Sequence, residues 1–110
     1  MDDFIKILAV ALKKLPYPVA YHHFNKPPKI PFIVYYLTGA DYEHADDLNY
    51  FCKSQVDIEI YSNTISENLK ATEEVEEILT KLNNAPIWRK TTVWIDDEQL
   101  YETILELEGF

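Results

Sequence analysis

The residues of this chain whose types and spacing come closest to a metal site lie between positions 41 and 47. There His44 is surrounded by four carboxylates, Asp41, Glu43, Asp46 and Asp47. Hard cations bind clustered carboxylates, but a calcium loop needs a D-x-D-x-D-G run and a terminal glutamate, which this segment lacks. The pattern therefore favours a solvated acidic loop, and the sequence predicts no metal site.

Cys52 and His44 are a pair that could act as a thiol and its base. Nucleophilic catalysis also needs an oriented imidazole and an oxyanion site, and no motif in the sequence supplies either. Cys52 is therefore interpreted as a small buried hydrophobe. His22 and His23 are adjacent on an expected strand, so their side chains should face opposite sides and not bind one ion together. One is expected in the core and the other in solvent.

Two further possibilities are catalysis by paired glutamates and nucleic-acid binding by tryptophans. Paired carboxylates can catalyse glycosyl transfer, but only in an apolar cleft that raises the pKa of one of them. The glutamates in question lie on the expected solvent face of a helix: Glu73, Glu74, Glu76 and Glu77. Trp88 and Trp94 could stack on nucleic-acid bases, yet only two basic residues lie beside them to bind phosphates. The sequence thus predicts core or subunit-interface aromatics and no catalytic residue.

Length and composition indicate an acidic globular protein. The 110 residues are 47% hydrophobic with a net charge of −9, and we expect a single domain over residues 1–110. This charge disfavours non-specific binding to nucleic acid or anionic membranes, because both need a basic surface. The single cysteine excludes an internal disulfide and fits a reducing cytoplasm. We expect no signal peptide, and lysines interrupt the short apolar segment 4–15 so that it should not span a membrane.

The charge is unevenly distributed along the chain. Residues 1–40 carry five lysines against two aspartates, whereas residues 96–110 carry six carboxylates and no base. Such a monomer could pair a basic edge with the acidic edge of a neighbour in a head-to-tail assembly. Ordinary solubility charge is the simpler alternative.

Periodicity predicts two helices, over residues 2–15 and 66–82, each with one apolar stripe. Before the second helix, strands are expected over residues 19–24 and 32–38, joined by a proline-rich connector. Residues 32–38 are apolar on both faces, so one face needs a helix and the other a loop or a neighbouring subunit. Residues 39–47 are expected to form a turn and an acidic loop.

A cleanly alternating strand over residues 55–62 is expected to be an inner element of the sheet. It should point Val56, Ile58 and Ile60 towards the helices. The opposite face should carry the alternate residues, Asp57, Glu59 and Tyr61. Residues 49–51 and 56–60 could form a hairpin, or the two could belong to one bent strand.

Two further strands are expected over residues 87–95 and 101–107, joined by a four-residue connection at 96–99 that suits a hairpin. The last strand places three carboxylates on one face, which should meet water or a polar interface. The fold class is therefore α+β, in the order α-β-β-β-α-β-β. Two helices should pack on one face of a mostly antiparallel or mixed sheet.

Several short segments, none of them a catalytic motif, follow one another along the chain in an order that is typical of one protein family. They are LPYPVAY at 15–21, two prolines at 27–28 before FIVYY, the segment 39–47 with its ADD, DIEIYSN at 57–63, and WIDDEQLY at 94–101. This succession resembles the tail-completion proteins of long-tailed phages and prophages. Those proteins are also described as tail-terminator, head–tail joining, or minor capsid and tail-component proteins.

The resemblance implies a structural protein that forms a six-fold ring on the finished tail tube and joins it to the head connector. Its partners would be its own copies, the tail-tube protein and the head-connector protein. It implies no enzymatic activity, and no small-molecule substrate, cofactor, membrane or specific nucleic acid, although the genome could pass through the ring. The protein would reside in the virion after assembly in the cytoplasm of the bacterial host. The expected interface residues are Asp41, Glu43, Asp46, Asp47, Asp57, Glu59 and Tyr61.

A second interpretation is a small acidic cytoplasmic adaptor domain for protein–protein interaction. Its negative surface could mimic nucleic acid and make it an inhibitor. An enzyme of unknown type is the third interpretation, but no triad, metal spacing or phosphate loop supports it.

Overall fold

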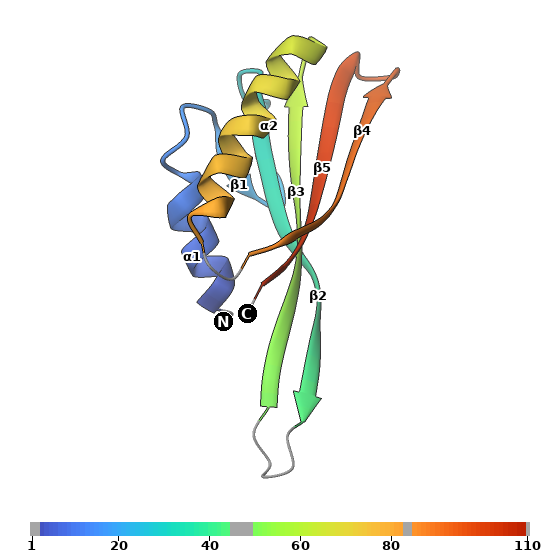
Figure 1. The fold of residues 1–110 in the computed structure, drawn as a ribbon. Helices are drawn as coiled ribbons and strands as arrows, with labels where there is room; N and C mark the ends of the chain where they lie inside the picture. The colour runs from blue at the N-terminus through green and yellow to red at the C-terminus, as the bar shows by residue number, and fades with distance from the viewer. Residues whose placement is uncertain (1–2, 45–49, 83–84, 110) are drawn as a thin grey trace.

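The computed structural model describes the backbone of residues 3–44, 50–82 and 85–109, and the side chains of residues 4–39, 54–82 and 85–109. Figure 1 shows two helices in front of a long twisted sheet. In chain order, the elements are α1 (Asp3–Leu12), β1 (Val19–Tyr21), β2 (Phe32–His44), β3 (Tyr50–Ser62), α2 (Ile65–Thr80), β4 (Ile87–Ile95) and β5 (Leu100–Gly109). The expected α+β class and element order are confirmed.

The sheet is mixed, with strand order β1-β2-β3-β5-β4. β1 pairs with β2 in parallel, and every other pair is antiparallel. β3 is the central strand, as expected of the alternating segment 55–62. Ile58 of β3 faces Tyr35 on one side and Leu105 on the other.

The core lies between the helices and one face of this sheet. Each element contributes residues at its own period, every third or fourth in the helices and every second in the strands. The fully buried members are Phe4, Leu8 and Leu12 of α1, Ile33 of β2, Val56, Ile58 and Ile60 of β3, Ala71 and Val75 of α2, and Leu105 and Leu107 of β5. The helix stripes and the strand alternation predicted from sequence are therefore confirmed.

A buried polar cluster fastens α2 to the sheet. Asn68 of α2 donates its side-chain N–H to the carbonyl oxygen of Ile60 at 3.0 Å. The hydroxyls of Thr103 and Thr72 both donate to Asn68 Oδ1. Thr92 of β4 extends the cluster to Thr103 at 2.8 Å. The helix stripe predicted from sequence did not include Asn68, because an asparagine outside the apolar positions resembles a solvent-facing residue.

The β2–β3 hairpin is longer than expected and extends beyond the rest of the sheet at the bottom of Figure 1. Gly39 to His44 continue β2 and pair with Tyr50 to Gln55, so the prediction of a loop beginning at Gly39 was wrong. A register irregularity between Leu37 and Gly39 accompanies the extension. β3 is one strand from Tyr50, so the alternative of a separate hairpin over 49–60 was also wrong. Residues 45–47 lie outside the described residues.

β1 ends at Tyr21, three residues before the predicted end. His22 has a φ of 70°, in the left-handed region, which turns the backbone out of the strand. At the other end of the chain, Gly109 of β5 lies against the ring of Phe4, where any Cβ would collide with the aromatic carbons. Neither helix is long and apolar enough to cross a bilayer, within the residues that the structure describes.

Candidate assembly interface

The face of the sheet opposite the helices carries a block of acidic and tyrosine side chains. The register places Asp57 of β3 directly across from Glu106 of β5, and Tyr61 directly across from Glu102. Glu59 lies between them on β3, opposite Val34 of β2. Carboxylates facing one another across strands destabilise a sheet unless other groups compensate them.

Tyrosine hydroxyls supply that compensation. Tyr61 Oη lies 2.7 Å from Glu102 Oε2 and 2.9 Å from Glu59 Oε1, as the donor in both contacts. Tyr36 of β2 donates to the other oxygen of Glu59 at 2.8 Å. A phenol has one proton, so Tyr61 donates to only one of its two carboxylates at a time. The three strands are thus joined by a tyrosine–glutamate network across this face.

Partial burial makes the negative charge of this network unfavourable. Burial is the main reason why the pKa of Asp57 is raised, and the charges of Glu106 and Glu59 add to it. Burial also raises the pKa of Glu102, against the lowering effect of the hydrogen bond from Tyr61. The pKa of Tyr61 is raised as well, so its hydroxyl keeps its proton and remains a donor. At the β4 side, Arg89 lies 3.6 Å from Glu106.

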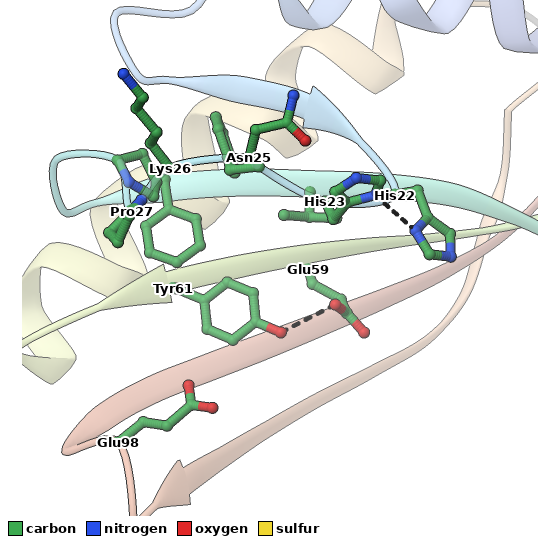
Figure 2. Close-up of a pocket in the computed structure, with 12 residues that line it drawn as sticks. His22, His23, Asn25, Lys26, Pro27, Glu59, Tyr61 and Glu98 are labelled. Atoms are coloured by element: carbon green, nitrogen blue, oxygen red, sulfur yellow. Dashed lines mark hydrogen bonds between the residues drawn. The ribbon is translucent and has the colours of Figure 1, made fainter.

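A pocket of about 350 Å³ opens beside this network, between the connector that follows β1 and the sheet (Figure 2). Its aromatic wall is formed by Phe24, edge-on to Phe32 at 5.6 Å, and by Tyr61, stacked on Phe32 at 4.9 Å. The connector covers Val34, which is only 6% exposed although it faces away from the helices. Of the two covers expected for the second apolar face of β2, the structure shows a loop of the same chain.

His22 and His23, at the rim of the pocket, differ from their prediction. Both are exposed, and their Nδ1 atoms lie 3.0 Å apart, as Figure 2 shows. The expectation of opposite faces was wrong because the positive φ of His22 ends the strand alternation. Among the described residues, no group of three or more histidine, cysteine, aspartate or glutamate side chains is placed to hold a metal ion.

The structure brings together three of the seven interface residues predicted from sequence. Asp57, Glu59 and Tyr61 lie on the face away from the helices, as expected. Asp41 and Glu43 lie on β2 opposite Lys53 and Phe51, in the part of the hairpin where only the backbone is described. The other two, Asp46 and Asp47, lie outside the described residues.

Sequence reasoning did not combine Glu102, Glu106 and Tyr36 with these residues. The signal was present in the three carboxylates that alternate on the last strand. What the sequence lacked was the pairing register between β3 and β5. The hydrophobic pattern of a strand shows which face each residue occupies, but not which residues lie beside it on the neighbouring strand.

Both tryptophans lie on β4 and are exposed, Trp88 by 59% and Trp94 by 44%. The alternative that they are core residues is therefore excluded. Cys52 and His44 lie where side chains are not described. The interpretation of Cys52 as a small buried hydrophobe therefore stays a prediction.

Comparison with known proteins adds one similarity of fold. No protein-family model matches the chain, and no curated protein matches its sequence. A solved structure described as the virion of a native gene transfer agent (GTA) particle contains a similar chain. The similarity covers 94% of this chain and 82% of that chain, with a TM-score of 0.64 and 13% sequence identity. An identity this low establishes a shared fold alone.

Proposed function

We propose that this chain is a non-enzymatic structural protein of a phage or prophage virion. In this proposal, its copies form a ring that terminates the tail tube and joins it to the head connector. The observation that carries the proposal is the fold shared, over 94% of the chain, with a chain of a GTA virion particle. The succession of sequence segments that resembles tail-completion proteins supports the same function independently of the fold.

The acidic face of the sheet suits such a ring. A passage lined by carboxylates repels DNA, so a genome could slide through without binding to the wall. The Asp57, Glu59 and Tyr61 side chains would then face the lumen or a neighbouring subunit. A lumen lined by lysines would contradict this placement.

The hairpin formed by β2 and β3 is the second element that we assign to contacts between subunits. It extends beyond the body of the sheet, where it could reach another protein. The predicted interface residues Asp41, Glu43, Asp46 and Asp47 belong to this region of the sequence. They would contact a neighbouring copy, the tail-tube protein or the head connector. In this proposal residues 1–110 act as one domain that assembles in the bacterial cytoplasm.

The test is electron microscopy of particles made without this protein. Deleting the gene from its phage or prophage should give tails of uncontrolled length that do not join heads. A copy of the gene supplied in trans should restore both properties. Tails of normal length that still join heads would contradict the proposal.

The acidic face also supports a second candidate, an adaptor or inhibitor that presents carboxylates in a nucleic-acid-like array. Sedimentation in the presence of tail-tube protein separates the two candidates. A ring subunit should join a large complex, whereas an adaptor should stay monomeric or dimeric.

A further inference from the structure

We propose that a groove beside α1 receives the tip of the β4–β5 hairpin from a second copy of this chain. The inference rests on the proposed ring and assigns one of its subunit contacts. It concerns a surface on the helical side of the molecule, away from the acidic face.

The groove is lined by aliphatic side chains and by lysines. It has a volume of about 420 Å³, and its lining residues are Lys6, Ile7, Val10, Ala11, Lys14 and Leu82. A second hollow of about 280 Å³ continues it between Ala11, Ile78 and Lys81. Ile7 is 45% exposed and Val10 is 64% exposed, although both belong to an otherwise well-packed helix. Adjacent exposed aliphatic side chains with charged residues beside them are typical of a protein-binding surface.

The lysines that line the groove and its continuation have no acidic partner among the described residues. In the part of the chain that the structure describes, no carboxylate forms a salt bridge with Lys6, Lys14 or Lys81. The occupant should therefore combine an apolar or aromatic side chain with several carboxylates.

The β4–β5 hairpin has this combination at its tip. Trp94 is the penultimate residue of β4 and has 44% of its surface exposed. Just beyond the strand, Asp96, Asp97 and Glu98 are also exposed. The indole is held in place, because its ring contacts Tyr101 at 4.7 Å and its N–H donates to Asp96 Oδ1 at 3.3 Å. A side chain already fixed loses little conformational entropy on binding, and tryptophan is enriched among residues that dominate binding energy.

The tip cannot fill the groove of its own chain. Trp94 pairs with Tyr101, which faces Ser62, so the tip lies near the start of α2. The groove lies at the other end of α2, and a helix of 16 residues separates the two by about 24 Å. Figure 1 shows the tip at the upper right and α1 at the left, closer to the bottom of the picture than the tip. Binding therefore joins different copies head to tail, a heterologous contact that can close into a ring.

Charge reversal tests this contact. One variant carries Lys14→Glu and Lys81→Glu in the groove, and the other carries Asp97→Lys and Glu98→Lys at the tip. Each should self-associate at least about tenfold more weakly than the wild type in sedimentation velocity, because like charges then face one another. An equimolar mixture should recover wild-type assembly, because each mutant surface then meets an oppositely charged one.

Matched controls carry the same net charge at other exposed positions. Lys29→Glu with Lys70→Glu controls for the groove, and Glu73→Lys with Glu77→Lys controls for the tip. Both controls should assemble as the wild type does. Circular dichroism on all four variants verifies that each is folded.

Three results would overturn the inference. The first is that the groove and tip variants assemble normally. The second is that both are impaired but mixing restores nothing, which would mean that the two surfaces do not bind each other. The third is that NMR signals of Ile7, Val10 and Trp94 in the wild type do not shift up to about 1 mM, which excludes even a weak contact. None of these results changes the outcome of the gene-deletion experiment, so the ring function stands or falls separately.

Discussion

The two faces of the sheet carry opposite kinds of side chain on the same strands. On the helix face, β3 and β5 present aliphatic side chains that pack against α1 and α2. On the other face, the intervening residues of the same strands present carboxylates and tyrosines that bind one another. The first face gains stability by removing apolar area from water. The second keeps charge half-buried in a hydrogen-bonded network. We infer that its composition serves assembly.

The largest expected effect is on the helix face. Ile58→Ala should lower the free energy of unfolding by about 2–5 kcal/mol, because it opens a cavity under both helices. Urea denaturation measures this loss. Ile104→Ala, on the other face of neighbouring β5, is the matched control and should lower stability distinctly less. Equal losses would show that the second face is also core.

Asn68→Ala tests the polar cluster within the helix face. It should lower the free energy of unfolding by about 1–3 kcal/mol, because the Thr103 hydroxyl and the Ile60 carbonyl lose their partner in a buried site. Urea denaturation is again the measurement. The exposed Asn63→Ala should change little, and a loss no greater than that of this control would contradict the role of Asn68.

Tyr61→Phe tests the network on the acidic face. It should lower stability by about 1 kcal/mol, because Glu59 and Glu102 lose a shared donor. The pKa of Glu102 should also rise further, since the Tyr61 hydrogen bond lowers it in the wild type. A carboxyl titration followed by NMR checks this. Tyr35→Phe, on the helix face, should leave that pKa in place.

The pH dependence of stability should distinguish the two faces. The pKa values of Asp57 and Glu102 are raised in the folded state. The folded state therefore binds more protons, so these groups contribute stability below the unfolded pKa near 4 and lose it as pH rises through the folded pKa. The double substitution Asp57→Asn with Glu102→Gln should remove this pH-dependent part of the stability. The variant should therefore be stabilised relative to the wild type by an amount that grows from about pH 4 to about pH 7. Urea titrations across this range measure it, and a pH-independent difference would contradict it.

Glu59→Lys should have the smallest effect on stability and a clear effect on assembly. Its side chain is half-buried and already surrounded by negative groups, so a cation there should leave the monomer folded. Thermal unfolding measures the first expectation, and sedimentation with tail-tube protein measures the second. If the variant is unfolded, this face belongs to the core. If it is folded and assembles normally, Glu59 does not contact a neighbouring subunit.

Local patterns predicted most of the fold and only part of the candidate interface. The β4 strand was predicted with its observed limits, because its β-branched and aromatic residues favour a strand and Pro86 stops the helix before it. The β2–β3 extension was missed, because Gly39 and the acids after it resemble a loop until they are paired with β3. The interface was incomplete for the same reason: Glu102 and Glu106 join Asp57 and Glu59 only through the register of distant strands.

The position of β5 in the sheet has a further consequence. β5 follows α2 and β4 in the sequence, yet it inserts between β3 and β4. The acidic network needs residues from both β3 and β5, so it cannot exist on a chain whose synthesis has stopped at α2. Until β5 pairs, one edge of β3 has no hydrogen-bonding neighbour and is open to aggregation. Only a chain that has completed its sheet therefore carries the tyrosine–glutamate network between β3 and β5.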